Sequence, residues 1–205
     1  MRSIFKQFSI LVILSVAISS LLSCSGTQQA ANGTSASSSE PVTSEEGSKA
    51  EPEKKKSDYP PIPSGVADAE IKNLDGTTWK VADKQGKVLL LNMWATWCGP
   101  CRSEMPSLVK MQEANRDKGF EVIGLNTDDE TADDINKFAE DMKLNYSLVW
   151  ADTGLQSSLV KISKFGGIPQ SFLIDRDGNL RGVFKGANPA DVKKMSDLVE
   201  MVVNE

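Results

Sequence analysis

The sequence predicts an α/β fold in which a mixed β-sheet is flanked by helices. Strand-like and helix-like patterns alternate over residues 64–205, and a hairpin signal follows them near the C-terminus, which together imply a mixed sheet covered by helices. The run at 88–94 is apolar at nearly every position, as in a central strand buried on both faces. The hairpin signal is Asp177-Gly178, which lies between two apolar runs. The hydrophobic fraction of 40% is sufficient for a core.

The individual elements follow from the periodicity of the apolar residues. An N-terminal β-hairpin is predicted from short strands at 67–71 and 78–81 around the turn Asp75-Gly76. Residues 131–142 are amphipathic with apolar side chains at helical spacing. The other predicted strands are 121–126, 146–150, 170–174 and 180–184, and the other predicted helices are 100–114, 155–162 and 190–203.

The first 63 residues carry export and linker signals. Residues 1–23 resemble a signal peptide, because a positively charged start precedes an apolar stretch too short for a membrane-spanning helix, which needs about twenty residues. The stretch ends in Leu-Leu-Ser-Cys, which resembles a bacterial lipobox and predicts lipidation at Cys24; an ordinary signal peptide with an incidental cysteine is the alternative. Residues 24–63 are rich in Ser, Glu, Lys and Pro and predict a disordered tether. These signals predict a cell-envelope protein, outside the cytoplasm and anchored to a membrane by lipid.

The composition excludes several classes of function. The formal net charge is −5, and an acidic chain of this kind is unsuited to nucleic acid, which requires clustered Lys and Arg. The sequence contains no histidine. This removes Ser-His-Asp and Cys-His nucleophiles, together with the usual ligands of catalytic zinc and haem. We therefore expect neither a metal nor a cofactor.

The most informative motif is Cys98-Gly99-Pro100-Cys101, at the junction of the buried strand and the following helix. Disulfide exchange requires a thiolate, an accessible sulfur and a second thiol that resolves the mixed disulfide. At a helix N-terminus, unpaired N–H groups and the helix dipole favour the thiolate of Cys98. Pro100 fits the first helical turn, where its missing N–H costs little. We predict that Cys98 attacks, that Cys101 resolves, and that Gly99 and Pro100 form the active-site loop.

Other roles fit the cysteine pair less well. A structural zinc site needs four ligands, and only two are present. Attachment of a c-type haem needs Cys-x-x-Cys-His, and Arg102 occupies the histidine position. A passive structural disulfide rarely spans two residues beside a buried strand. The pair is therefore predicted to be redox-active.

Two motifs about seventy residues apart resemble a known family. Residues 97–101 (WCGPC) resemble the thioredoxin active site. The wider runs 92–106 (NMWATWCGPCRSEMP) and 165–175 (FGGIPQSFLID) resemble the TlpA/ResA-like branch of membrane-tethered extracytoplasmic thioredoxins. The resemblance covers residues 64–205. It implies a thioredoxin-like α/β fold with an N-terminal β-hairpin and a central insertion at 131–150, and a thiol–disulfide oxidoreductase activity.

The resemblance also implies roles for residues outside the cysteine pair. Pro169 matches a cis-proline that faces the dithiol, where the backbone of Ile168 could pair with a substrate strand; a proline that merely ends a glycine loop is the alternative. Trp97 would bind substrate at the edge of the site, or serve surface packing alone. Glu104 matches a carboxylate near the cysteines that could move protons and raise a thiol pKa, against the alternative of an exposed helix-surface acid. Asn92 stands where cytoplasmic thioredoxins have a buried Asp, which makes Glu104 the better proton acceptor.

Four functions remain open. The first is a reductase of envelope-protein disulfides, in this branch often serving cytochrome c maturation, with a membrane thiol-electron donor as partner. The second is a disulfide oxidase or isomerase with the same residues. A thiol peroxidase is disfavoured, because Leu91 and Ala95 stand where its Pro-x-x-x-Thr-x-x-Cys motif needs proline and threonine. The last, a non-catalytic binding lipoprotein, would have no reason to keep both the cysteine pair and the cis-proline.

Overall fold

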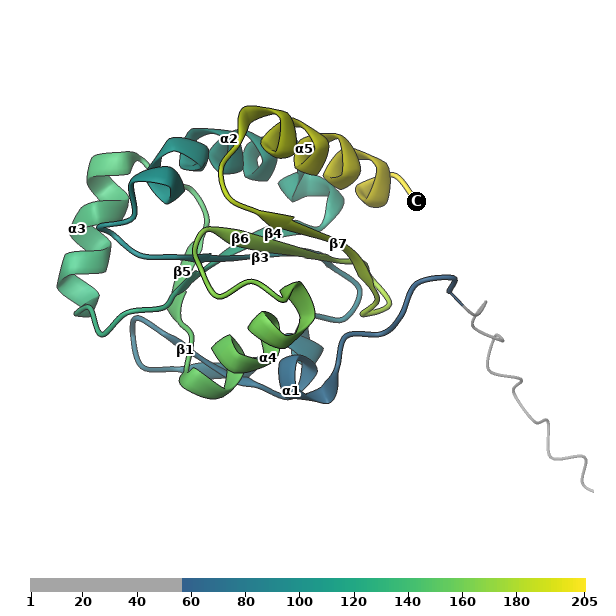
Figure 1. The fold of residues 1–205 in the computed structure, drawn as a ribbon, viewed down its shortest axis with the longest axis horizontal. Coiled ribbons are helices and arrows are strands. Elements are labelled where there is room, and N and C mark those ends of the chain that lie inside the picture. Colours follow the sequence, from purple (N-terminus) through teal and green to yellow (C-terminus); the bar gives the residue numbers. More distant parts are fainter. Residues whose placement is uncertain (1–56) are drawn as a thin grey trace, which may run out of the picture. The chain divides into compact units, whose positions relative to one another are not determined.

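A seven-stranded mixed sheet with the strand order β2-β1-β5-β4-β3-β6-β7 forms the centre of residues 57–205, the part of the chain that the computed structural model describes (Figure 1). The central strands β3, β4 and β5 run parallel, and the remaining neighbours pair antiparallel. The predicted α/β class and mixed sheet are therefore confirmed. The strands are β1 (Glu70–Asn73), β2 (Thr78–Lys80), β3 (Val88–Trp94), β4 (Phe120–Asn126), β5 (Ser147–Trp150), β6 (Gln170–Ile174) and β7 (Leu180–Lys185).

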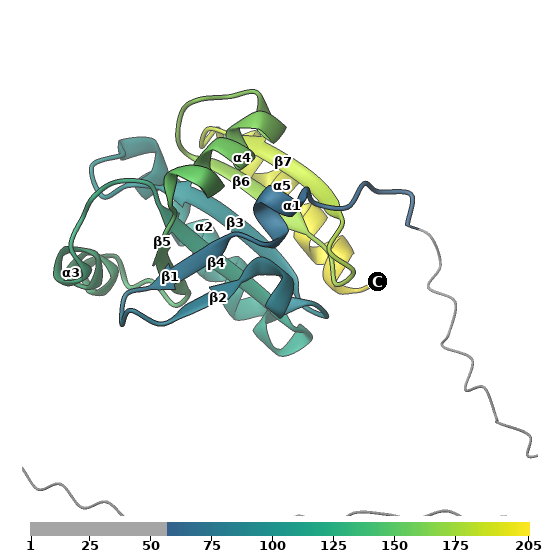
Figure 2. The same ribbon diagram turned by 90° about the horizontal axis from the view of Figure 1, so that it is seen from below.

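Helices cover both faces of this sheet. Figures 1 and 2 show α2 and α5 together on one face and α1 and α4 together on the other. Two short 3₁₀ helices, η1 (Val81–Lys84) and η2 (Arg116–Lys118), complete the connections. None of the helices within residues 57–205 is long and apolar enough to cross a bilayer. The α-helices are α1 (Ser64–Ala67), α2 (Gly99–Asn115), α3 (Ala132–Met142), α4 (Thr153–Ser163) and α5 (Pro189–Val203).

Strand β3 is the axis of the core, and every one of its residues is buried. Its side chains from Val88 to Leu91 alternate between two clusters, because successive residues of a strand point to opposite faces. Leu89 and Leu91 pack with residues of α4, whereas Leu90 packs with residues of α2 and α5. Full burial of one such leucine contributes roughly 1.5–3 kcal/mol. This double burial fixes the strand that leads directly into Cys98.

The start of the domain differs from the predicted elements. The strand expected at 67–71 begins at Glu70, because residues Ser64–Ala67 form the helical turn α1 and bury Val66. A hairpin with β1 and β2 follows as predicted. The region at 131–150, expected to be an insertion, contains α3 and then β5, which enters the sheet between β1 and β4.

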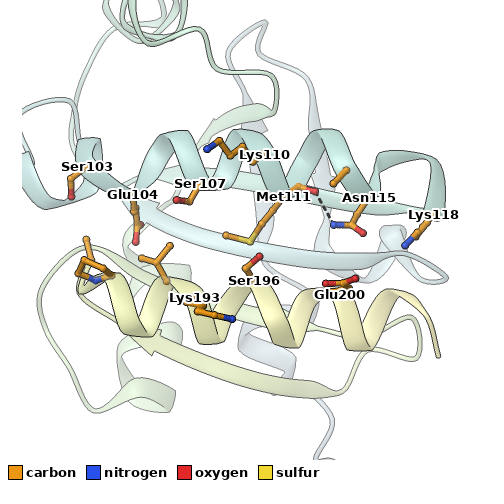
Figure 3. Close-up of a pocket in the computed structure, with 14 residues that line it drawn as sticks. Ser103, Glu104, Ser107, Lys110, Met111, Asn115, Lys118, Lys193, Ser196 and Glu200 are labelled. Atoms are coloured by element: carbon orange, nitrogen blue, oxygen red, sulfur yellow. Dashed lines mark hydrogen bonds between the residues drawn. The ribbon is translucent and has the colours of Figure 1, made fainter.

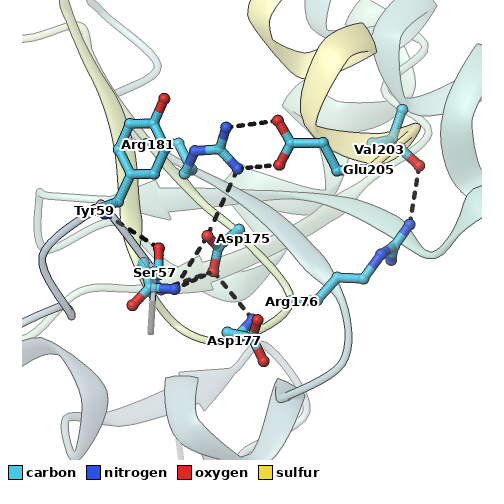
Figure 4. A network of polar contacts seen from close by, with 9 residues as sticks. Ser57, Tyr59, Asp175, Arg176, Asp177, Arg181, Val203 and Glu205 are labelled. Carbon is cyan, nitrogen blue, oxygen red and sulfur yellow. Dashed lines mark hydrogen bonds and ion pairs between the residues drawn. The ribbon is translucent and has the colours of Figure 1, made fainter. Parts of the chain in front are cut away.

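Residues 60–62, which the predicted boundary at residue 63 assigns to the tether, contact the β6–β7 hairpin. The backbone N–H of Ile62 donates to Gly178 O (3.0 Å), and that of Leu180 donates to Pro60 O (2.8 Å). The guanidinium of Arg181 lies 4.0 Å from the centroid of the Tyr59 ring (Figure 4). These contacts hold the chain against the β6–β7 hairpin before residue 63. The predicted signal peptide, Cys24 and the tether up to residue 56 lie outside the described residues.

Candidate active site

Cys98 and Cys101 form a disulfide at the start of α2, with their Cα atoms 5.3 Å apart. Cys98 immediately precedes the first helical residue, and its Sγ accepts a hydrogen bond from the backbone N–H of Cys101 (3.2 Å). Gly99 and Pro100, predicted to form the active-site loop, are the first two residues of α2, and Pro100 lies in the first helical turn as expected. In the reduced form, a thiolate at this position would be stabilised by the N–H groups and dipole of the helix N-terminus.

Both cysteines are buried, at 3% and 0% exposure, but only one of them lines a groove. Cys98 lines a groove of about 450 Å³ that we call the disulfide groove, whereas Cys101 is fully buried and does not line it. The other walls of the disulfide groove include Trp97, Pro100 and Ile168. A substrate sulfur can therefore approach Cys98 from the groove, which is the geometry expected of an attacking cysteine.

The loop that precedes β6 forms the wall opposite the cysteines. The peptide bond between Ile168 and Pro169 is cis, with Ile168 half-buried in the disulfide groove and Pro169 buried. The next residue, Gln170, pairs with Met93 of β3, which brings this loop beside the end of the strand that leads to Cys98. The Nε2 of Gln170 also donates to the backbone oxygens of Phe165 and Gly167, which closes the loop.

Glu104 is buried one helical turn after Cys101, and only 3% of its surface is exposed. The Nδ2 of Asn92 donates to its Oε1 (2.7 Å) and also to Ser171 Oγ (2.9 Å). Burial raises the pKa of Glu104 to about 7, and the hydrogen bond from Asn92 opposes that rise only in part. The alternative of an exposed surface acid is therefore wrong. A carboxyl group with a pKa near neutrality can both accept and release a proton.

Glu104 also borders a second opening, on the side of the molecule covered by α2 and α5. Figure 3 shows its side chain at one end of a groove between these two helices. This groove is about 760 Å³ and includes Lys110, Lys193 and Ser196. Glu104 does not line the disulfide groove. Glu104 and Cys98 thus border openings on different surfaces of the molecule.

Trp97 is 68% exposed, so it is a surface residue of the disulfide groove. Its indole N–H donates to Asp128 Oδ2 (2.6 Å), and this hydrogen bond lowers the pKa of Asp128. The neighbouring Thr96 donates from its hydroxyl to Glu130. The sequence interpretation missed Asp128 and Glu130. Their place directly after β4 is the signal that could have revealed them, since loops at the carboxyl ends of neighbouring parallel strands meet at one edge of the sheet.

The described part of the chain contains no candidate metal site. Within residues 57–205, no group of three or more His, Cys, Asp or Glu side chains is arranged to hold a metal ion. The site combines a disulfide, an open groove at one of its sulfurs, a cis-proline wall and a buried acid. That set of groups can exchange disulfides with a second molecule through Cys98 and Cys101.

Comparison with known proteins supports this chemistry. Residues 63–183 match the model of the AhpC/TSA family. A thiol-disulfide oxidoreductase ResA from Geobacillus thermodenitrificans is 28% identical over 65% of this chain and 75% of its own length. A ResA from Bacillus cereus is 34% identical over 54% of this chain and 61% of its own length.

Solved structures have the same fold. A putative thiol:disulfide interchange protein DsbE from Chlorobium tepidum aligns with a TM-score of 0.59 and 28% identity, over 71% of this chain and 96% of its own. A putative protein disulfide isomerase from Bacteroides thetaiotaomicron aligns with a TM-score of 0.59 and 26% identity, over 67% of this chain and 86% of its own. The predicted thioredoxin-like fold is confirmed by these neighbours.

Proposed function

Since this chain belongs to the AhpC/TSA family and is a thiol–disulfide oxidoreductase, we propose that it reduces disulfides in proteins of the cell envelope. The observation that carries the proposal is a cysteine pair at the N-terminus of α2, in which Cys98 lines the disulfide groove beside the cis-proline loop and Cys101 does not. An accessible sulfur begins exchange, and a second thiol within bonding reach completes it.

The first step is attack on the client. The Cys98 thiolate, formed in the reduced protein, attacks one sulfur of a client disulfide lying in the disulfide groove. A bond forms between Cys98 Sγ and that sulfur, and the client S–S bond breaks. The other client sulfur leaves as a thiolate and takes a proton from solvent. The half-buried Ile168 offers its backbone beside this reaction as an edge for an extended client segment.

The second step resolves the mixed disulfide. Glu104, as a carboxylate, takes the proton of the Cys101 thiol, and the Cys101 thiolate attacks Cys98 Sγ. The bond between Cys98 and the client breaks, and the second client sulfur leaves as a thiolate and is protonated. Two electrons have then moved from the dithiol to the client, and the Cys98–Cys101 disulfide seen in the structure is the product.

A reductase of this type must be reduced again after each cycle. The proposal therefore includes a membrane thiol-electron donor as partner and the envelope as the place of action. Lipidation at Cys24 and a tether up to the domain would keep the protein at the membrane, and clients of cytochrome c maturation fit the same setting. The nature of the client and of the donor is part of the proposal and rests on the sequence resemblance.

The reduction potential of the Cys98–Cys101 pair tests the direction of electron flow. The full chain is equilibrated with thiol buffers of defined potential, and the fraction of dithiol is measured by alkylation. We expect a value near that of thioredoxin, about −270 mV, which makes the dithiol a reductant. A value near that of DsbA, about −120 mV, would reverse the proposed direction and make the protein an oxidase.

A further inference from the structure

The disulfide groove does not end at the cysteines. It continues into a second groove of about 650 Å³, and the two share Thr127 and Gln156 as lining residues. We call this second opening the carboxylate groove. Its lining includes the charged side chains Glu70, Lys72, Asp128, Asp129, Glu130 and Asp152.

The carboxylate groove carries five acidic side chains against one lysine. Within residues 57–205, no Lys or Arg forms an ion pair with any of the five. The Nζ of the single lysine, Lys72, lies 5.5 Å from the centroid of the Trp150 ring. Carboxylates that lack a cation partner keep their full charge and give the groove a negative potential.

The hydrogen bonds that position these carboxylates come from neutral donors. Asp128 accepts from the indole of Trp97, and Asp152 accepts from the backbone N–H of Leu155 at the start of α4 (2.7 Å). Neutral donors fix the orientation of a carboxylate without cancelling its charge. The negative potential is therefore held in place directly beside the site of exchange.

We propose that the disulfide groove and the carboxylate groove together bind an extended client segment that carries Lys or Arg a few residues from its disulfide. This client class rests on the proposed function, because the disulfide groove would seat the reacting sulfur. The exposed Trp97 and the half-buried Ile168 supply the apolar contact that a polypeptide uses and that a free cation does not. Successive residues of an extended chain advance about 3.3 Å each, so a cation several residues from the client cysteine reaches the second groove.

A charge series of peptides tests this client class. Three peptides share one disulfide and differ only in flanking residues, which are Lys, Ser or Glu. The full chain is reduced beforehand, and the rate of peptide reduction is followed in single turnover. At low salt we expect the Lys peptide to react at least about fivefold faster than the Glu peptide. At roughly 0.5 M salt the preference should fall below about twofold, because screening shortens the reach of the charges.

A matched pair of variants assigns the preference to the groove. Glu70→Gln combined with Asp129→Asn removes two carboxylates that make no side-chain hydrogen bond or ion pair within residues 57–205. Glu113→Gln combined with Asp117→Asn removes the same charge at exposed positions that line neither groove. We expect the first pair to lower the Lys-over-Glu preference at least about twofold, and the second to leave it unchanged.

The outcomes separate this proposal from the function on which it rests. Equal rates for all three peptides at low salt, with normal reduction of the neutral hydroxyethyl disulfide, would overturn the client class alone. An equal loss of preference in both variant pairs would assign the effect to overall charge and also overturn it. Failure to reduce any disulfide, including the neutral one, would overturn the proposed function and this inference together.

Discussion

Asn92 and Glu104 form a hydrogen bond that joins strand β3 to helix α2, with 2.7 Å between Asn92 Nδ2 and Glu104 Oε1. Both side chains are buried, at 1% and 3% exposure. The donor is a neutral amide, so burial dominates and the pKa of the carboxyl group rises to about 7. The same amide donates to Ser171 of β6, which fixes its orientation. A carboxyl group that titrates near neutrality therefore lies one turn from the resolving cysteine.

Replacement of Glu104 by Gln should remove the pH dependence that the Glu104 carboxyl group gives to resolution by Cys101. In the parent, resolution by Cys101 should accelerate as pH rises through about 7, where Glu104 becomes a carboxylate. Gln keeps an acceptor for the Asn92 amide but takes up no proton. We expect resolution to slow by roughly 10²-fold or more above pH 7. The inflection near pH 7 in the plot of resolution rate against pH should disappear. An unchanged rate–pH profile for decay of the mixed disulfide would remove Glu104 from the mechanism.

The same substitution should change how stability depends on pH. Because the pKa of Glu104 is raised in the folded state, the folded protein holds a proton that the unfolded chain releases above pH 4.5. Stability is therefore lost as pH rises from about 4.5 to about 7, by up to ~3 kcal/mol. Denaturant unfolding at pH 5 and pH 8 should show a smaller difference for Glu104→Gln than for the parent. Equal differences for the two proteins would contradict the raised pKa.

Asn92→Leu should raise the pKa of Glu104 further. The hydrogen bond from Asn92 is the contact that lowers this pKa, so its loss leaves burial unopposed. We expect the inflection in resolution to shift above pH 7, with a loss of about 1–3 kcal/mol in stability because Ser171 also loses its partner. Ser171→Ala is the matched control, since it removes one bond of Asn92 and keeps the bond to Glu104. A shift of equal size in both variants would show that Asn92 acts through packing.

The two cysteines should behave differently when each is replaced by Ser. Cys98 lines the disulfide groove and Cys101 does not. Cys101→Ser should therefore trap a mixed disulfide between Cys98 and a client peptide, detectable by mass under non-reducing conditions. Cys98→Ser should trap none and should lose exchange activity. Stable trapping through Cys101 in the Cys98→Ser variant would reverse the assigned roles.

Arg181 should stabilise the junction between the N-terminal segment and the domain. Its side chain is 4% exposed, pairs with Glu205 and Asp175, and stacks on the Tyr59 ring (Figure 4). Arg181→Met removes these contacts and leaves the partly buried Asp175 without its cation, so we expect a loss of about 2–4 kcal/mol in denaturant unfolding.

An exposed ion pair provides the comparison for Arg181. Lys193→Met breaks the pair between Lys193 and Asp197, whose side chains are 74% and 61% exposed. That change should cost less than about 0.5 kcal/mol, because exposed pairs are screened by water. Similar losses in the Lys193 and Arg181 variants would show that burial of Arg181 adds nothing.

The sequence by itself determined the class of fold and the reacting sulfurs. Burial of a central strand on both faces requires a continuous apolar run, and the run at 88–94 therefore predicts β3 with its observed bounds. The order of the chain then places the cysteine pair directly after that strand, at the start of a helix. Helix and strand periods, turn glycines and cysteine spacing are local properties, and local properties can be read from neighbouring residues.

Only the tertiary structure decided what surrounds the sulfurs. Strand pairing brings together residues that are far apart in the sequence. These residues determine which cysteine lines a groove, whether Glu104 is buried, and which carboxylates lie beside Trp97. The contact between Asn92 and Ser171 spans 79 positions, and no local pattern encodes such a distance. The start of the domain was set in the same way, since residues before 63 are held by the distant β6–β7 hairpin. Burial and charge environment arise from these long-range contacts. Burial sets the pKa of Glu104, and the neighbouring carboxylates set the electrostatic potential around the disulfide.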